Sequence, residues 1–553
     1  MTAELTRVGV IGAGTMGAGI AQIAAGAGGD VVLYDVAAEV VERGLARIRA
    51  GYDRMVTRGK LTEDEREAAL ARISVATTLD ALTTAQIVIE AAPEDLALKQ
   101  RLFGELAQIC ATDAILASNT SSLSITRLAA GVQNPERVVG MHFFNPAPVL
   151  PLVEVISGAA TAPAVADAVV ALAERWGKTP VRASDTPGFI VNRVARSFSG
   201  EALRIVGEGI ATADEIDRIV RTAGFRMGPF ELMDLVGIDI NLAVHRAIYE
   251  QTFGEPRYRP HPLQDRMVAA GHLGRKSGQG FYRYEGGERV ADDATRPFAE
   301  IAPNGRKASI LIAGQGATAD ELALALQDAG QTVSTYSTEE STTLVNAGIP
   351  RARRLRDVLM TTTVAIEATL GPRELKRAYW FELDEMLPPQ IPLLSLALGH
   401  GTTELGSWSA RPERVIGLGL AGPFATAPIV ELARGARTGE AALGRAVGFL
   451  RALGKEIAVV GDPPGQVLTR ILSSLINEAA FALEEGLASA DDIDTALQLG
   501  LNYPLGPIAW SERIGIDRVV ATLDGLHTYY GEERYRVAPR LRRSLLAGYA
   551  RLT

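Results

Sequence analysis

The chain has 553 residues, with 56 Lys or Arg against 65 Asp or Glu, which gives a formal net charge of −9. Domains usually run to about 100–200 residues, so this length excludes a protein with one core. The acidic balance argues against general nucleic-acid binding, and 47% hydrophobic residues exclude a chain that is disordered throughout.

Cysteine usage and hydropathy restrict the cellular setting. Cys110 is the only cysteine, which rules out an internal disulfide and favours a reducing compartment. The N-terminal residues show no charged segment followed by a long apolar one, and no run approaches the ~18 apolar residues of a membrane span. We therefore expect a cytoplasmic protein with neither a membrane nor a nucleic acid as its partner.

Strands and helices alternate through the first part of the chain. Residues 7–12 form a short apolar strand, a glycine-rich turn and a helix follow, and residues 31–35 form a second strand closed by a carboxylate. Further buried strands are predicted at 87–91, 114–118, 138–142 and 152–156. This alternation predicts a Rossmann-like, doubly wound α/β sheet.

The glycine-rich turn has the features of a dinucleotide-binding site. Gly12 permits the tight turn, Gly14 lets the backbone approach a pyrophosphate, and Gly17 lets helix and strand pack closely. Thr15 and Met16 complete the turn, where the first amides of the helix face the phosphates. Asp35 is expected to accept hydrogen bonds from the ribose and to repel a 2′-phosphate, so NAD is favoured over NADP. The alternative is a set of plain turn glycines.

The pattern becomes helical after residues 185–188 and remains so to about residue 250. Residues 286–307 are polar and are predicted to be a linker. An internal repeat then appears, because the PERVVG of residues 135–140 recurs as PERVIG at 412–417, an offset of 412 − 135 = 277. The predicted domains are 1–184 (NAD-binding), 185–285 (helical), 308–461 (a degenerate second Rossmann-like copy) and 462–553 (a second helical domain).

Several separated motifs in the first copy resemble one family. They are Val10–Gly17, Ser118–Ser122, Gly140–Pro146, Asp185–Phe189 and Asn192–Arg193. Together they resemble the 3-hydroxyacyl-CoA dehydrogenases, strongly over residues 7–285 and weakly over 308–553. The resemblance implies a catalytic pair, His142 and Glu154, with Ser121 and Asn192 contacting substrate. It also places four residues near NAD: Asp35, Glu94, Lys99 and Asn145.

The chemistry of alcohol oxidation supports these roles independently. NAD takes the hydride, and a histidine has a suitable pKa to take the hydroxyl proton near neutral pH. His142 ends a predicted strand, and Glu154 in the next strand is placed to hold the imidazole tautomer. The alternatives are a structural histidine, a surface glutamate, a helix-capping Ser121 and an ordinary helical Asn192. The spacing of the other histidines suggests no metal site.

A basic helix face is the predicted binding surface for the anionic CoA that the family uses. Arg43, Arg47, Arg54 and Arg58 recur at steps of 4, 7 and 4, and Lys60 follows. We assign substrate binding to Arg54, Arg58 and Lys60, with a solvated helix face paired with local glutamates as the alternative. A small polar residue is common in the family where Gly51 stands.

The second copy has lost the residues of the predicted site. At the same offset His142 becomes Gly419, Asn145 becomes Gly422 and Asn192 becomes Thr469. Gly17 corresponds to Ala319 and Asp35 to Ser337. From Gly12 to His142 is 130 residues but from Gly314 to Gly419 only 105, and the missing 25 fall where the basic helix lies in copy one. We expect residues 308–461 to be non-catalytic.

The sequence therefore predicts an NAD-dependent (S)-3-hydroxyacyl-CoA dehydrogenase with one active site per chain. The tandem layout resembles bacterial members that act on 3-hydroxybutyryl-CoA or, in phenylacetate breakdown, on 3-hydroxyadipyl-CoA. We expect the two helical domains to pair as an internal pseudo-dimer, and whole chains to associate further as a homo-oligomer. Two alternatives stay open: a hydroxy-acid or sugar-acid dehydrogenase of the same fold, and a non-catalytic NAD-binding scaffold.

Overall fold

The computed structural model describes residues 5–290, 307–427 and 429–552. They form two compact units, which are described separately. Unit 1 contains Met1–Val194, Glu250–Thr252 and Ala482–Gly506, and unit 2 contains Ala195–Tyr249, Phe253–Phe481 and Pro507–Thr553. These units group the chain differently from the predicted boundaries, because a segment of the second helical part packs in unit 1. Most of the predicted linker, 291–306, lies outside the described residues.

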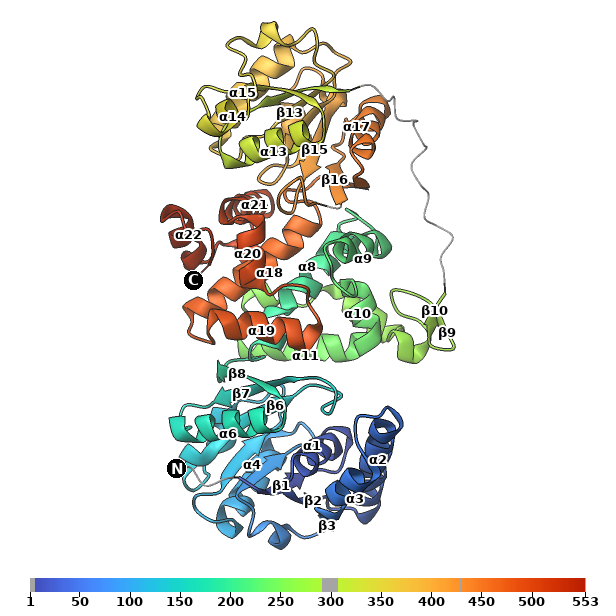
Figure 1. Ribbon diagram of the computed structural model, residues 1–553, viewed down its shortest axis with the longest axis vertical. Coiled ribbons are helices and arrows are strands. Elements are labelled where there is room, and N and C mark those ends of the chain that lie inside the picture. The colour runs from blue at the N-terminus through green and yellow to red at the C-terminus, as the bar shows by residue number, and fades with distance from the viewer. Residues whose placement is uncertain (1–4, 291–306, 428, 553) are drawn as a thin grey trace. The chain divides into compact units, whose positions relative to one another are not determined.

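Unit 1 is built on an eight-stranded sheet of Rossmann type with the order β3-β2-β1-β4-β5-β6-β7-β8 (Figure 1). Its strands are β1 (Arg7–Ile11), β2 (Asp30–Tyr34), β3 (Ile73–Ala76), β4 (Ile87–Glu90), β5 (Ile115–Ser118), β6 (Val138–Phe143), β7 (Leu152–Ser157) and β8 (Thr179–Ser184). The first six are parallel, but β7 runs antiparallel to β6. The connection of residues 144–151 is too short for a crossover, which needs a dozen or more residues.

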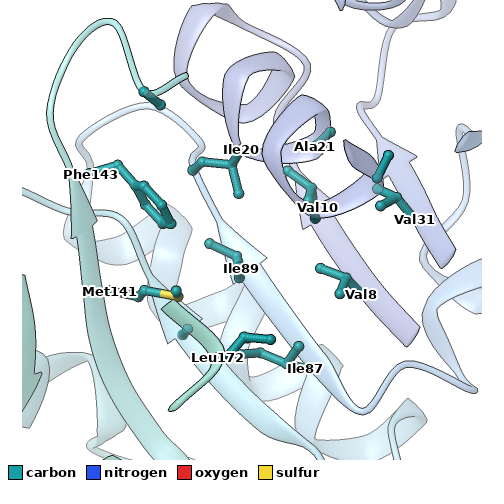
Figure 2. Packing of buried hydrophobic residues seen from close by; sticks show 14 of the residues in the cluster. Val8, Val10, Ile20, Ala21, Val31, Ile87, Ile89, Met141, Phe143 and Leu172 are labelled. Carbon is teal, nitrogen blue, oxygen red and sulfur yellow. The ribbon is translucent and has the colours of Figure 1, made fainter. Parts of the chain in front are cut away.

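Helices cover both faces of this sheet. They are α1 (Thr15–Gly26), α2 (Ala38–Thr57), α3 (Glu63–Ala71), α4 (Leu96–Ile109), α5 (Ile125–Ala129), α6 (Pro163–Arg175) and α7 (Val191–Val194). Figure 2 shows the core on one face, where Val10 of β1 and Ile89 of β4 lie near Ile20 of α1. Each such side chain contributes about 1.5–3 kcal/mol by leaving water. This core fixes the strand ends that carry the site.

Unit 2 contains the second copy, a seven-stranded sheet with the order β12-β11-β13-β14-β15-β16-β17. Its strands are β11 (Ser309–Ala313), β12 (Thr332–Tyr336), β13 (Val364–Glu367), β14 (Leu393–Leu396), β15 (Val415–Gly419), β16 (Ile429–Ala433) and β17 (Glu456–Val460). Its helices are α13 (Ala317–Asp328), α14 (Thr342–Asn346), α15 (Arg373–Met386), α16 (Thr402–Ser407) and α17 (Glu440–Ala452). Between β12 and β13 the described chain has the short α14 and a 3-10 turn at Leu355–Asp357, where copy one has α2, α3 and β3. The predicted loss of the basic helix is therefore confirmed.

The remaining elements are helical apart from a small hairpin. The first set is α8 (Arg196–Gly207), α9 (Ala213–Thr222), α10 (Pro229–Val236), α11 (Ile238–Gln251) and α12 (Pro262–Ala269), followed by β9 (Tyr284–Glu285) and β10 (Glu288–Arg289). The second set is α18 (Leu468–Glu484), α19 (Ala490–Leu501), α20 (Pro507–Ile514), α21 (Ile516–Tyr530) and α22 (Pro539–Leu546). Among the described residues, no helix is both long enough and apolar enough to cross a bilayer.

Contacts within unit 2 join the two helical sets through equivalent residues. The Tyr258 hydroxyl donates to Glu478 Oε1 at 2.5 Å, and the Tyr535 hydroxyl donates to Glu201 Oε1 at 2.7 Å. The offset of 277 converts Tyr258 into Tyr535 and Glu201 into Glu478. A reciprocal exchange of this kind is the signature of a two-fold interface.

A buried arginine anchors this interface. Arg470 of α18 is fully buried, and its guanidinium contacts Glu201 of α8 at 2.5 Å and Glu208, the residue that follows α8, at 2.9 Å. The hydroxyls of Tyr530 and Tyr535 lie 2.9 Å from the same guanidinium. Every charge in this cluster therefore has a partner, as burial of ions requires.

We expect Arg470→Met to lower the apparent free energy of unfolding by about 3–5 kcal/mol, because it leaves the buried carboxylate of Glu201 without its cation. Urea unfolding curves measure the loss. Arg542→Met is the matched control, since Arg542 pairs with Asp524 on the surface, where such pairs contribute at most about 1 kcal/mol. Equal losses in the two variants would contradict this account of the interface.

Candidate active site

The glycine-rich turn between β1 and α1 has the shape that dinucleotide binding requires. Gly12 has φ +91°, and a Cβ there would lie 2.6 Å from the Ala91 carbonyl oxygen. A Cβ on Gly17 would lie 1.7 Å from the Gly12 oxygen, so only glycine fits. A Cβ on Gly14 would meet nothing within 4 Å, which leaves open space for a ligand. Gly12 and Gly17 are therefore required by close packing, whereas Gly14 leaves room for a ligand to approach the backbone.

The start of α1 is available to an anion. The helix begins at Thr15, and its N-cap residue, Gly14, has no side chain to satisfy the first amides. Thr15 is exposed, whereas Met16 is half-buried against the core. Asp35 follows β2 and lies beside the turn, where its Oδ2 accepts a hydrogen bond from the Ala13 amide at 2.9 Å. The residues of the turn thus fit an adenosine diphosphate group.

A buried ion-pair network supports the loop that follows β5. Lys99 is 1% exposed and lies 2.8 Å from Glu90 Oε1 and 3.1 Å from Glu94 Oε2. Glu94 Oε1 accepts hydrogen bonds from the Ser121 and Ser122 amides, each at 3.2 Å. Burial raises the pKa of Glu94, but the charge of Lys99 and the neighbouring hydroxyls outweigh it, so the pKa lies below its ordinary value. Glu94 and Lys99 therefore hold the Ser121 loop in place.

His142 and Glu154 form a buried pair across two antiparallel strands. The register of β6 and β7 places the two residues directly opposite each other. The Nδ1 atom of His142 lies 2.7 Å from Oε2 of Glu154, and both side chains are buried. Oε1 of Glu154 accepts the amides of Ile190 and Val191 at 2.9 and 3.0 Å. One carboxylate therefore fixes the imidazole and the start of α7 together.

Ser121 and Asn192 also come together, as the sequence predicted for residues of one site. The Asn192 side-chain amide donates to the Ser121 carbonyl oxygen at 3.5 Å, a long hydrogen bond. Asn145 is exposed in the connection that follows β6. Sequence reasoning missed Gln251, whose side chain donates to the Ser122 carbonyl oxygen at 3.1 Å. Only the tertiary structure brings this distant helix end to the loop.

The basic face of α2 is exposed and free of internal ion pairs. In the described structure, no carboxylate contacts its cations or the two that follow the helix; they are Arg43, Arg47 and Arg54 in α2, then Arg58 and Lys60. The opposite face is buried through Val41, Ile48 and Tyr52. A Cβ on Gly51 would lie 2.4 Å from Gln22 Oε1, so a larger residue there would have to displace the Gln22 amide group. Among the described residues, local glutamates therefore do not neutralise this face of α2.

Comparison of the two copies distinguishes residues that stabilise the fold from residues that belong to the candidate site alone. The Glu90, Lys99 and Ser118 cluster is retained as Glu367, Lys376 and Ser395 with the same contacts. Lys99 therefore has a structural role that does not depend on NAD.

Glu154 is also retained, as Glu431, which accepts the amides of Val467 and Leu468 at 2.7 and 3.0 Å. The imidazole is not retained, and a Cβ on Gly419 would lie 2.5 Å from Gln466 Oε1. Burial, only partly offset by the two amides, raises the pKa of Glu431 to about 7. The histidine position is thus lost although the scaffold around it persists.

Other features of the described residues add no further chemistry. No group of three or more His, Cys, Asp or Glu side chains among them is arranged to hold a metal ion. Cys110 is buried and unpaired, and burial raises the pKa of its thiol.

Comparison with known proteins gives a consistent picture. The sequence model described as "3-hydroxyacyl-CoA dehydrogenase, NAD binding domain" matches residues 7–186 and 309–463, and the corresponding C-terminal domain matches 188–284 and 465–552. The 3-hydroxyadipyl-CoA dehydrogenase of Escherichia coli K12 is 39% identical over 552 residues, covering 99% of this chain and 100% of that protein.

Two further relatives extend the comparison. A probable 3-hydroxybutyryl-CoA dehydrogenase of Bacillus subtilis is 47% identical over 283 residues, covering 51% of this chain and 98% of that protein. A crystal structure of 3-hydroxybutyryl-CoA dehydrogenase from Escherichia coli K12 matches with a TM-score of 0.77 and 36% identity, covering 98% of this chain and 99% of that one. The tandem arrangement is therefore shared with full-length relatives.

We expect Gly14→Ala to weaken NADH binding by about tenfold or more, because the added methyl group would occupy the space through which a pyrophosphate approaches. Its melting temperature should stay unchanged, since the methyl group meets no protein atom within 4 Å. NADH fluorescence titration gives the affinity. Gly104→Ala in α4, also in open space, is the control and should bind NADH normally. Normal binding by Gly14→Ala would show that the turn does not hold the cofactor.

Proposed function

Because the chain belongs to the 3-hydroxyacyl-CoA dehydrogenase family, we propose that its one active site is in the first copy, with His142 as the general base. The reaction is the reversible, NAD-dependent oxidation of an (S)-3-hydroxyacyl-CoA to the 3-oxoacyl-CoA. The observation that carries the proposal is the buried His142–Glu154 pair, which the second copy lacks.

The cofactor is held by the turn between β1 and α1. When bound, NAD⁺ supplies the acceptor for the hydride that leaves the substrate carbon. Gly14 and the first amides of α1 bind the pyrophosphate, and Asp35 binds the ribose hydroxyls. The negative charge of Asp35 repels a 2′-phosphate, which selects NAD over NADP. Glu94 and Asn145 would also lie near NAD, and Lys99 would act there through its contact with Glu94.

His142 removes the hydroxyl proton during oxidation and returns it during reduction. Its Nδ1 atom is engaged by Glu154, so Nε2 is the ring nitrogen directed to the substrate. Glu154 fixes this tautomer and stabilises the imidazolium that forms after proton transfer. A positioned base of this kind contributes about 10²–10⁴-fold to the rate.

Ser121 and Asn192 position the reacting oxygen. The Ser121 hydroxyl makes no hydrogen bond within the described chain, so it is available to the substrate. The loop that carries it is anchored by Glu94, and α7, which carries Asn192, begins where Glu154 accepts two amides. The base and its two neighbours are thus tied to the same rigid strand ends.

The substrate is a short 3-hydroxyacyl-CoA, and the basic face of α2 binds its CoA phosphates through Arg54, Arg58 and Lys60. The net charge of −9 makes a local cationic surface necessary for an anionic ligand. The name of the full-length relative from Escherichia coli supports a 3-hydroxyadipyl group as the acyl portion. A role in phenylacetate breakdown is part of this proposal, because the tandem layout resembles the bacterial members of that pathway.

The second helical part serves as an internal partner for the first. The reciprocal Tyr258–Glu478 and Tyr535–Glu201 hydrogen bonds support a pseudo-dimer within one chain. In unit 1, Arg193 of α7 pairs with Glu485 at 2.7 Å, so the second helical part also buttresses the helix that carries Asn192. The degenerate half is retained because the catalytic half needs this contact.

We expect His142→Gln to lower kcat by about 10²–10⁴-fold, because glutamine has no titratable nitrogen to take the proton. Glu154→Gln should lower kcat on the order of 10²-fold, since it releases the imidazole. Steady-state assays with acetoacetyl-CoA and NADH measure both, and NADH titration checks that the cofactor still binds.

Glu431→Gln is the matched control, since Glu431 accepts the equivalent pair of amides without a histidine. It should change the melting temperature about as much as Glu154→Gln and leave kcat unaltered. Full activity in His142→Gln would overturn the assignment of the base, and no turnover by the wild type would favour a binding scaffold.

We expect the double variant Arg47→Glu, Arg54→Glu to raise KM for CoA thioesters about tenfold or more, because it replaces attraction to the phosphates by repulsion. The effect should shrink at high salt, and NADH affinity should not change. Assays with 3-hydroxyadipyl-CoA and 3-hydroxybutyryl-CoA over a range of salt give the KM values.

The double variant Arg445→Glu, Arg451→Glu on α17 carries the same change of charge on an exposed helix of the second copy. An equal rise in KM in this control would show a general charge effect. An unchanged KM in both double variants would favour a substrate without CoA.

A further inference from the structure

We propose that Gln251 is a positioning residue for the dehydrogenase reaction and acts by fixing the loop that presents Ser121 to the substrate; this role rests on the proposed function. Gln251 is the last residue of α11 and is half-buried. The segment Glu250–Thr252 belongs to unit 1, although the rest of α11 belongs to unit 2. The contact between Gln251 and the loop therefore lies wholly within unit 1.

The Ser121 loop is held on its amide side by one carboxylate oxygen. Oε1 of Glu94 accepts the amides of Ser121 and Ser122 at 3.2 Å each, and the Ser122 hydroxyl at 2.9 Å. All three donors belong to the loop, and a carboxylate cannot bind the loop's carbonyl oxygens. Those oxygens need donors of their own if both sides of the loop are to be fixed.

Two side chains supply these donors on the carbonyl side. Asn192 donates to the Ser121 carbonyl oxygen at 3.5 Å, and Gln251 donates to the Ser122 carbonyl oxygen at 3.1 Å. Hydrogen bonds from N–H to oxygen usually measure about 2.7–3.2 Å, so the Asn192 contact is long and the Gln251 contact is in the normal range. Gln251 is therefore the stronger of these two anchors.

The second copy has lost this anchor together with the site. A contact that the fold alone requires is retained there, as the Lys376–Glu367 pair shows. The side chains that hold the Ser121 loop are not retained. At the offset of 277, Glu94 becomes Gly371, Asn192 becomes Thr469 and Gln251 becomes Thr528. The loss of Gln251 thus accompanies the loss of the serines, which become Leu398 and Gly399.

The corresponding space in the second copy is open. Gly371, Gly399 and Thr528 line a pocket of about 590 Å³ that lies entirely in unit 2. Among the described residues, no hydrogen bond joins Gly371 or Thr528 to the loop of Leu398 and Gly399. The seven-stranded sheet forms without those contacts. The Gln251 contact is therefore not needed to build this fold, and its role is to hold the Ser121 loop.

Gln251→Met tests this role, because methionine keeps the length of the side chain and removes the donor. With acetoacetyl-CoA and NADH, kcat should fall about 5–20-fold. This is less than the roughly 10²-fold that a 1 Å displacement can cost, since Glu94 still holds the amide side. KM for NADH should stay within about twofold, because the loop is not part of the dinucleotide turn.

Two further variants separate the donor from shape and stability. Gln251→Glu keeps the shape but places a carboxylate against the Ser122 carbonyl oxygen. It should lose at least as much activity, and it decides the question if Gln251→Met does not fold. Gln100→Met is the matched control, because Gln100 of α4 donates to the Arg127 carbonyl oxygen at 2.8 Å, beyond the loop. It should keep kcat within about twofold and change the melting temperature about as much as Gln251→Met.

A double-mutant cycle with Ser121→Ala shows whether Gln251 acts through Ser121. In the Ser121→Ala background, Gln251→Met should lower kcat by no more than about twofold, since the hydroxyl that it positions has gone. A full further loss in that background, an equal loss in Gln100→Met, or unchanged kcat in both Gln251 variants would overturn this role and leave the proposed function intact. No turnover of acetoacetyl-CoA by the wild type would refute both.

Discussion

A carboxylate buried between two antiparallel strands is the interaction on which the catalytic half depends. Glu154 is fully buried, and a charge in such a place must be met by donors. Two of the donors are backbone amides at the start of α7, and the third group is the His142 imidazole. The same carboxylate thus joins the sheet to the helix that carries Asn192 and sets the direction of the His142 imidazole.

The duplication shows what happens when one of these partners is removed. Glu431 keeps its two amides but has no imidazole, and burial raises its pKa to about 7. Gln466, the counterpart of Phe189, occupies the space beside Gly419. The carboxylate survives because the amides at the start of the following helix still need an acceptor. Accepting these two amides is therefore a sufficient reason to retain the glutamate, with or without a histidine opposite it.

The same comparison shows what the second copy contributes to the structure. Its helical part supplies Glu478 and Arg470 to an interface whose contacts are repeated by equivalent residues of the first part. Its sheet has Ala319 and Ser337 where the first copy has Gly17 and Asp35, and it lacks the basic helix. The fold of that half is nevertheless kept, because β13, β14 and the Lys376–Glu367 pair are retained.

Local sequence patterns were enough to predict the two Rossmann-like sheets, the glycine turn and the loss of α2 in the second copy. They did not give the direction of β7, because an apolar run reads the same in either direction. That direction places Glu154 directly opposite His142. Nor did they show that residues 482–506 pack in unit 1, or that Gln251 reaches the Ser121 loop. These contacts join residues far apart in the sequence, where periodicity carries no information. The sequence patterns also did not show that Glu94 accepts the backbone amides of the Ser121 loop.

The most direct measurement is a crystal structure of the full-length protein with NAD⁺ and acetoacetyl-CoA. The account predicts that Nε2 of His142 lies within about 3.2 Å of the 3-oxygen, with Nδ1 still held by Glu154. It also predicts the nicotinamide ring about 3–3.5 Å from the third carbon. An imidazole turned away from that oxygen, or a coenzyme bound only in the second copy, would contradict it.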